Sequence, residues 1–172
     1  MASASSPPAV RSSLPKWCRK LSKKTTLAKP KYLLDVNVLI ALSWPEHSQH
    51  GLARRWFARH RAKGWATCPL AEAGFVRIVS NPAFSSRSVS VQQATEGLAD
   101  SLRDDAHHFW ADSISWPDAI AMFASPIKGH QQITDAYLLG LAIREKGVLV
   151  TLDKALKSLA GPRYSKHLLI LE

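Results

Sequence analysis

The sequence has only two cysteines, Cys18 and Cys68, among its 172 residues. They are far apart and no C-x-x-C spacing occurs, so neither a disulfide framework nor a zinc knuckle is indicated. This usage fits a reducing cytoplasm. No apolar run approaches the roughly 18 residues of a membrane span, so we expect a cytoplasmic protein that does not cross a membrane. G-x-G-x-x-G and P-loop motifs are also missing, which argues against a nucleotide-cofactor enzyme.

Acidic residues are missing from the first 30 positions, which contain seven Lys and Arg and are rich in Ser, Pro and Ala. We interpret residues 1–30 as a basic, disordered tail. An organellar transit peptide, a nucleic-acid-binding arm and a leader from a start codon assigned too early are the alternatives. Because the tail supplies seven units of the net charge of +10, that charge says little about the partners of residues 31–172.

The remaining segment, 31–172, has the length of one globular domain. Short apolar runs alternate with helical spacing, which predicts a mainly parallel sheet covered by helices on both faces. The segment 36–42 is either a helical turn or a continuation of the first strand. We place Gly147 at the C′ position that closes the last predicted helix. The predicted strands are 31–34, 64–68, 107–110, 148–152 and 168–171, and the predicted helices are 49–61, 69–80, 90–105, 116–124 and 134–146.

Four carboxylates stand where apolar segments end or begin. Asp35 and Asp153 follow predicted strands, and Glu72 and Asp135 fall in the first turn of predicted helices. Since parallel strands end, and the following helices begin, at one edge of a sheet, we expect the four to share one rim. An all-oxygen cluster suits Mg²⁺ or Mn²⁺ rather than zinc. The placement therefore indicates a divalent-cation site.

Each acid also has a purely structural alternative. Asp135 could cap a helix, Glu72 could complement a helix dipole, and Asp153 could open a turn. Asp35 is the hardest to explain in this way, because an apolar run resumes directly after it. The adjacent pair His107-His108 falls on a predicted strand, so its side chains face opposite ways, which argues against a joint metal site.

The run Leu34-Asp35-Val36-Asn37-Val38-Leu39-Ile40-Ala41-Leu42 resembles the opening motif of PIN-domain proteins, especially ribonuclease toxins of VapC type. The similarity continues through Ala71-Glu72, the segment 129–139 and Thr151-Leu152-Asp153, and it covers about residues 31–160. The Gly-His-Gln-Gln run at 129–132 and Trp116-Pro117 resemble one bacterial subgroup. Lys154-Ala155-Leu156 departs from the pattern, because many members have an aromatic residue there.

The resemblance implies a three-layer α/β/α sandwich and Mg²⁺- or Mn²⁺-dependent hydrolysis of RNA phosphodiester bonds. It also implies the toxin role in a type II toxin–antitoxin system, with a cognate antitoxin that blocks the site, and a homodimer. All four acids are then expected to be metal-binding carboxylates. Asp35 and Asp135 would be direct or water-mediated ligands, and Glu72 and Asp153 would complete the site or orient the water. Asn37 and Thr151 match supporting polar positions. The catalytic acids implied by the family motif are Asp35, Glu72, Asp135 and Asp153.

Two other functions remain open. A phosphohydrolase of haloacid-dehalogenase type also begins with a strand followed by Asp, but it has a second acid two residues later, where this chain has Asn37. A non-catalytic RNA-binding or interaction module could use the same fold. Such a module would not need all four acids, so their presence favours the enzyme.

Overall fold

The central layer of the protein is a five-stranded, entirely parallel sheet. The computed structural model describes residues 31–84, 88–123, 127 and 129–172, so the predicted tail at 1–30 lies outside the described residues. The strands follow the spatial order β3-β2-β1-β4-β5. Their bounds are β1 (Tyr32–Leu34), β2 (Trp65–Thr67), β3 (His107–Phe109), β4 (Val148–Thr151) and β5 (Leu168–Ile170). All five predicted strands are confirmed.

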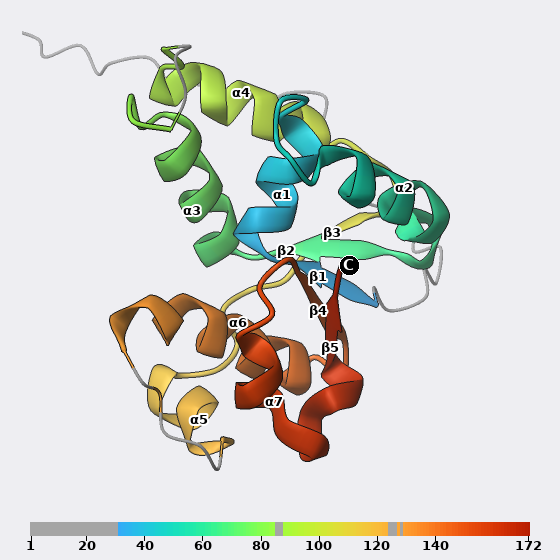
Figure 1. Ribbon diagram of the computed structural model, residues 1–172, viewed down its shortest axis with the longest axis vertical. Helices are drawn as coiled ribbons and strands as arrows, with labels where there is room; N and C mark the ends of the chain where they lie inside the picture. Colours follow the sequence, from blue (N-terminus) through green and yellow to red (C-terminus); the bar gives the residue numbers. More distant parts are fainter. Residues whose placement is uncertain (1–30, 85–87, 124–126, 128) are drawn as a thin grey trace, which may run out of the picture.

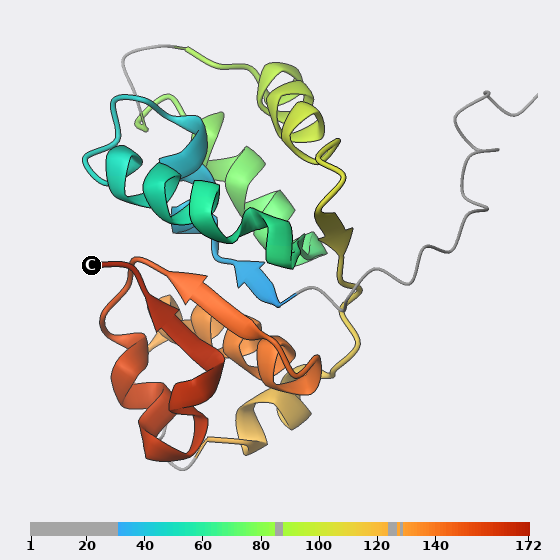
Figure 2. The ribbon, with the colours of Figure 1, turned by 90° about the vertical axis from the view of Figure 1, so that its right-hand side faces the viewer.

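Helices cover both faces of this sheet (Figures 1 and 2). One layer contains α1 (Val36–Ser43), α2 (His50–His60), α3 (Pro69–Val79) and α4 (Val91–Ser101). The other layer contains α5 (Trp116–Ala121), α6 (Ile133–Arg144) and α7 (Leu156–Tyr164). Short 3-10 turns at 61–63, 130–132 and 165–167 complete the described elements. The predicted three-layer α/β/α sandwich is therefore confirmed.

The inner strands are buried on both faces, as strands between two helical layers must be. All three residues of β1 are buried, and so are Leu149 and Val150 of β4. Helix α6 is correspondingly apolar around most of its circumference, with every residue from Ala136 to Ala142 buried. In the described part of the chain, no helix is long and apolar enough to cross a membrane.

The chain turns from β1 into α1 within a single residue, Asp35. The segment 36–42, for which a helix and a strand were both possible, is helical. Asp35 has extended backbone angles (φ −68°, ψ 156°), and its side chain accepts a hydrogen bond from the Val36 N–H, as an N-cap residue does. The sharp turn fixes this carboxylate at the carboxyl end of the central strand.

The strand order reverses between β1 and β4. From β1 the chain moves outward to β2 and β3, and then crosses to β4 and β5 on the other side. In open parallel sheets the crevice at such a reversal, outside the carboxyl ends of the strands, is where ligands bind. Asp35 follows β1 and Asp153 follows β4, so the two flank this crevice.

The end of α6 differs from the sequence prediction for Gly147. The residue with the left-handed backbone that closes the helix is Lys146 (φ 57°), and Gly147 comes one position later. The N–H of Gly147 donates to Ala142 O (2.8 Å) and that of Lys146 to Ile143 O (3.0 Å), the pair of bonds of a Schellman motif with Lys146 at C′. Gly147 is required for space instead, because a Cβ there would lie 2.4 Å from Cη2 of Trp110.

Helix α7 was not predicted from the sequence. Its buried residues Leu156, Leu159 and Ala160 have helical spacing, but Gly161 and Pro162 follow directly. Gly161 adopts a positive φ of 54°, so the element is kinked there. A Gly-Pro pair is a strong turn signal in sequence, and it hides this short helix.

Replacement of Gly147 by alanine should destabilise the fold by about 1–3 kcal/mol, the usual cost of overpacking a core. The added methyl group would collide with the buried Trp110 ring and lie 3.1 Å from the Lys31 carbonyl oxygen. Urea denaturation measures the change. The matched control is Gly97→Ala in exposed helix α4, where a Cβ meets no atom within 4 Å, and it should stabilise by roughly 0.5–1 kcal/mol. Equal effects of the two variants would contradict the close-contact explanation.

Candidate functional site

Asp35 lies at the centre of the candidate site and is only 3% exposed. Its Oδ1 accepts a hydrogen bond from the Val36 N–H (2.6 Å). Its Oδ2 accepts from Thr151 Oγ1 (2.6 Å) and from Asn37 Nδ2 (2.7 Å). A buried carboxylate needs such partners to remain in the protein interior.

Thr151 and Asn37, predicted as supporting residues, form one network around Asp35. The fully buried Thr151 Oγ1 donates to Asp35 and accepts from Asn37 Nδ2 (3.0 Å) and the Asp153 N–H (3.0 Å). Its one proton and both lone pairs are therefore used. Asn37 Oδ1 also accepts from the Leu152 N–H (3.1 Å). These bonds tie the start of α1 to the end of β4.

Three of the four predicted acids influence one another electrostatically. Burial raises the pKa of Asp35 despite its hydrogen bonds, and the charge of Asp153 adds to the rise. Burial, followed by the charges of Asp35 and Asp153, raises the pKa of Asp135 from 3.8 to about 7. Asp135 lies in the first turn of α6 and does not cap it, because Gln132 occupies the N-cap position. Asp153 also opens a turn, through a bond from the Ala155 N–H (2.8 Å).

A groove of about 380 Å³ opens beside Asp35 and Asp135, between α1, α3 and the start of α6. Most of its wall is apolar, and Arg77 of α3 is the basic residue that lines it. The groove therefore combines carboxylates with a cationic side chain. The residues lining it are Asp35, Val36, Asn37, Ile40, Leu70, Ala73, Gly74, Arg77, Ile78, Thr134 and Asp135.

These acids fit a divalent cation of the hard, oxygen-binding kind. Burial first, and then the charges of neighbouring acids, raise the pKa values of Asp35 and Asp135, and a bound cation would offset both effects. Within the described residues, no group of three or more His, Cys, Asp or Glu is arranged to hold a metal ion. Mg²⁺ is commonly bound through one or two carboxylates with several waters retained, so it does not need such a group.

Glu72, the fourth predicted acid, is held separately. It lies in the first turn of α3, and its Oε1 accepts a hydrogen bond from Thr67 Oγ1 (2.5 Å). It does not line the groove beside Asp35, and the acids that raise the pKa values of Asp35 and Asp135 do not include it. The structure therefore brings together Asp35, Asp135 and Asp153, and places Glu72 beside the next strand end.

Thr67 and Arg77 were not singled out from the sequence, and His107 was considered there only with His108, for a joint metal site. Thr67 ends β2 as Thr151 ends β4, and this shared position is the signal that could have found it. His107 Nε2 lies 2.8 Å from Thr67 Oγ1, a long-range contact without a local sequence signal. Arg77 lies one helical turn after Ala73 and Gly74 on the groove side of α3, so its place follows from helical periodicity.

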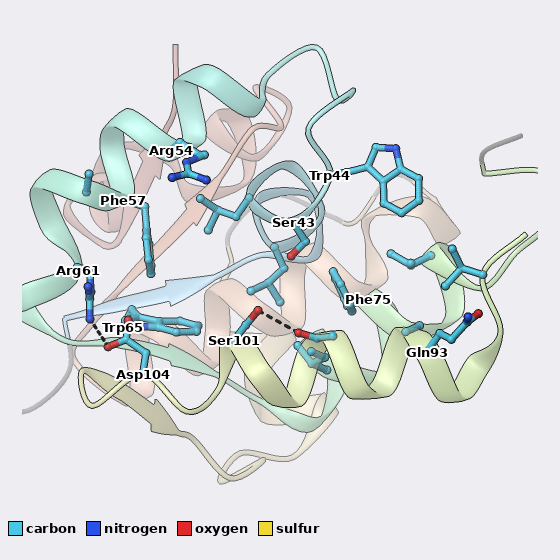
Figure 3. Close-up of a pocket in the computed structure, with 18 residues that line it drawn as sticks. Ser43, Trp44, Arg54, Phe57, Arg61, Trp65, Phe75, Gln93, Ser101 and Asp104 are labelled. Atoms are coloured by element: carbon cyan, nitrogen blue, oxygen red, sulfur yellow. Dashed lines mark hydrogen bonds and ion pairs between the residues drawn. The ribbon is translucent and has the colours of Figure 1, made fainter. Parts of the chain in front are cut away.

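A larger hollow, of about 730 Å³, is formed by other faces of α1 and α3 together with α2 and α4 (Figure 3). Its lining is mainly apolar and contains none of the four acids. At one end Arg61 Nη2 contacts Asp104 Oδ1 (2.7 Å), and Trp65 Nε1 donates to Asp104 Oδ2 (3.2 Å). Arg54 and Gly97 also line the hollow.

Comparison with known proteins identifies the family. Residues 32–162 match the family model of the PIN domain. The chain is 43% identical over 129 residues to Ribonuclease VapC39 of Mycobacterium tuberculosis (strain ATCC 25618 / H37Rv), an alignment that covers 75% of this chain and 93% of the relative. It is 42% identical over 131 residues to Ribonuclease VapC38 of the same strain, with 76% and 91% covered.

A solved structure supports the fold. The crystal structure of VapBC2 from Rickettsia felis, bound to a DNA fragment from their promoter, contains a chain that superposes with a TM-score of 0.58. The match covers 82% of this chain and 98% of that one at 17% sequence identity, so it concerns the fold alone. Together with the family model and the two relatives of more than 40% identity, it leads to one conclusion: the chain belongs to the PIN-domain family.

Proposed function

We propose that this protein is a divalent-cation-dependent ribonuclease and the toxin of a toxin–antitoxin pair. The observation that supports this most directly is the buried Asp35 at the reversal of strand order, with the charges of Asp135 and Asp153 beside it. Relatives named as VapC ribonucleases agree with it. The cytoplasmic location and the homodimer expected from the sequence remain predictions.

The chemistry follows from the charge of the substrate. A phosphodiester is anionic, so it repels both the acids and an attacking hydroxide. Mg²⁺ or Mn²⁺, when bound, would neutralise phosphate charge and acidify water. Asp35 and Asp135 are the proposed ligands, and Asp153 makes the potential beside them more negative. Glu72, in the first turn of α3, would complete the site or orient the water. Thr151 and Asn37 hold Asp35 in one orientation, since both donate to its Oδ2.

Arg77 gives the same groove a contact for the RNA backbone. Its side chain is exposed and lines the groove that begins at Asp35 and Asp135. A guanidinium binds phosphate through paired N–H donors, so Arg77 can hold a phosphate next to the one that is cleaved. The apolar wall between the two, which includes Ile40 and Leu70, can contact a base or sugar.

The haloacid-dehalogenase alternative is disfavoured by the geometry of Asn37. That chemistry needs a second carboxylic acid two residues after the first Asp, and here Asn37 Nδ2 donates to Asp35 Oδ2 (2.7 Å). An amide in this bond supports the carboxylate and cannot act as an acid or base. A phosphatase assay on small phosphomonoesters should therefore give no turnover.

Asp35→Asn should reduce cleavage of RNA in Mg²⁺ by at least ~100-fold, which corresponds to about 2.7 kcal/mol of lost transition-state stabilisation. The amide has no negative charge for a cation, and it places an NH₂ group among the donors that now point at Asp35. The control is Asp100→Asn on the surface, whose ion pair with Arg103 is exposed at both ends. Chelation by EDTA should abolish wild-type cleavage, and Mg²⁺ or Mn²⁺ should restore it without Zn²⁺. Full cleavage by the Asp35 variant would disprove the proposed metal site at Asp35.

Asp135→Asn should stabilise the cation-free protein, and more so as the pH rises. Because folding raises the pKa of Asp135 from 3.8 to about 7, the folded state binds the proton more tightly than the unfolded chain. The stability that Asp135 contributes to the wild-type protein is fully present below about pH 4 and is lost as the pH rises through 7. In EDTA, the melting temperature of the variant should exceed that of wild type by ~2 °C or more at pH 8. A difference that does not change between pH 5 and 8 would contradict this.

The hollow in Figure 3 is the proposed docking site for an apolar segment of the antitoxin. Its wall is mainly apolar, as the centre of a protein interface is. Arg54 lines it and has no ion-pair partner among the described residues, so a carboxylate of the segment would complement it. The acids face a different groove, so a further part of the antitoxin would have to reach them to block the site.

Gly97→Trp should abolish binding of the cognate antitoxin while RNA cleavage remains. Gly97 lines the hollow, and a Cβ there meets no atom within 4 Å. The indole can therefore enter the hollow without strain, and helix α4 loses a poor helix former. The control, Gly97→Ala, should bind like wild type. Binding is measured by calorimetry and inhibition by RNA cleavage with antitoxin added; undiminished inhibition of the tryptophan variant would exclude this hollow as the docking site.

A further inference from the structure

The hydroxyl of Thr67 joins a proposed catalytic acid to a histidine on another strand. Thr67 is the last residue of β2 and is fully buried. Its Oγ1 lies 2.5 Å from Glu72 Oε1 and 2.8 Å from His107 Nε2. Glu72 is in the first turn of α3, and His107 begins β3. One buried oxygen therefore links three elements at the edge of the sheet.

The number of protons available on these side chains sets the direction of the two hydrogen bonds of Thr67. A threonine hydroxyl has one proton, and an ionised carboxylate can only accept. The proton of Thr67 is therefore donated to Glu72, and the Thr67 oxygen must accept from His107. This requires a proton on Nε2 of the His107 ring, which fixes its tautomer.

The environment of His107 agrees with a neutral ring. Burial and the neighbouring His108 lower the pKa of His107, and the charge of Asp104 and a hydrogen bond to the backbone of Leu102 only partly oppose this. A neutral imidazole has a single ring proton, and the bond to Thr67 requires it on Nε2. The ring is also held by packing, because its centroid lies 4.6 Å from that of the Trp65 ring.

We propose that Thr67 and His107 are positioning residues that hold Glu72 in its active orientation through the chain His107–Thr67–Glu72. The chain fixes Oε1, so Oε2 is left as the oxygen available to a cation or a reacting water. This inference rests on the proposed ribonuclease function, because that function requires a fixed orientation of the Glu72 carboxylate. It also explains why the buried Thr67 and the half-buried His107 are polar.

The hydrogen bond from Thr67 can offset the cost of fixing the Glu72 side chain. A free glutamate side chain loses conformational entropy when it is fixed, and a hydrogen bond to a charged group can offset this. Residues that orient metal-binding groups from behind typically change affinity or activity by 10–100-fold when they are removed. We therefore expect effects of that size at Thr67, although it does not line the acidic groove.

Thr67→Val tests the inference, because it removes the hydroxyl and keeps nearly the same shape. The valine variant should bind Mn²⁺ about 10-fold more weakly by calorimetry and cleave RNA 10–100-fold more slowly. The matched control, Thr67→Ser, keeps the hydroxyl and should stay within about threefold of wild type for both, since its oxygen can make the same bonds. Binding and cleavage by the valine variant equal to wild type would overturn the proposal.

Nitrogen-15 NMR of the intact protein gives a readout that does not depend on activity. At neutral pH the His107 ring should show a proton on Nε2 in wild type and in Thr67→Ser. A proton on Nδ1 with Nε2 accepting would overturn the proposal, because Thr67 could not then donate to Glu72. If Thr67→Val proves unstable, His107→Phe should lower the same affinities and rates, and His107→Gln, whose amide can donate, should retain more of them.

Two further variants separate this inference from the proposed function. In a Glu72→Gln background, Thr67→Val should add little, because its effect passes through Glu72; a full additional loss would overturn the proposal. If the wild-type protein cleaves no RNA in Mg²⁺ or Mn²⁺, the ribonuclease function itself is wrong, and if Asp35→Asn cleaves RNA normally, the acid site is wrong. If Asp35→Asn is inactive but Thr67→Val is normal, the function stands and only the role of Thr67 and His107 is rejected.

Discussion

The hydrogen bond from Thr151 to Asp35 is the interaction on which the site depends. It joins the end of β4 to the end of β1 at the point where the strand order reverses (2.6 Å). Without it, a nearly fully buried carboxylate would lose one of three donors, and a buried group that lacks its partner is costly. Asn37 closes the same link from α1 through its bonds to Asp35, Thr151 and Leu152. The fold therefore specifies the orientation of the carboxylate before any ligand binds.

The same arrangement occurs twice in the sheet. β2 and β4 are the two neighbours of β1, and each ends in a fully buried threonine, Thr67 and Thr151, that donates to an acid. The acids differ in their origin, because Asp35 follows the central strand and Glu72 lies in the helix after β2. A short hydroxyl side chain suits this place, since it hydrogen-bonds without filling the edge of the sheet. Burial and, after it, the charges of Asp35 and Asp153 raise the pKa of Asp135 to about 7, and ionising this group weakens the cation-free fold.

Most of the architecture could be predicted from the sequence because it rests on local signals. Apolar runs located all five strands, and the order of the four acids along the chain indicated the edge of the sheet where three of them meet. The predictions for Gly147 and Glu72 differ from the structure because they depend on contacts between residues far apart in the sequence. Gly147 was given a helix-closing role because glycine usually has it, whereas the close approach of Trp110 is the reason for a glycine there. The separation of Glu72 from the other acids depends on Thr67 and His107, which are 40 residues apart. Such a contact leaves no periodic trace in a single sequence.

Helices α1 and α3 separate the two proposed sites in this molecule. One side of each faces the acidic groove, through Asn37 and Arg77 among others, and another faces the larger hollow, through Leu42 and Phe75. Residues on the hollow side can change to suit a partner without disturbing the hydrogen bonds around Asp35, because those bonds involve only the first residues of α1 and the end of β4. Conversely, the acids are constrained by burial and by one another, so they tolerate little change. A chain built in this way can keep one chemistry while its partner specificity varies, and the physical reason is that the two surfaces share a backbone and no side chain.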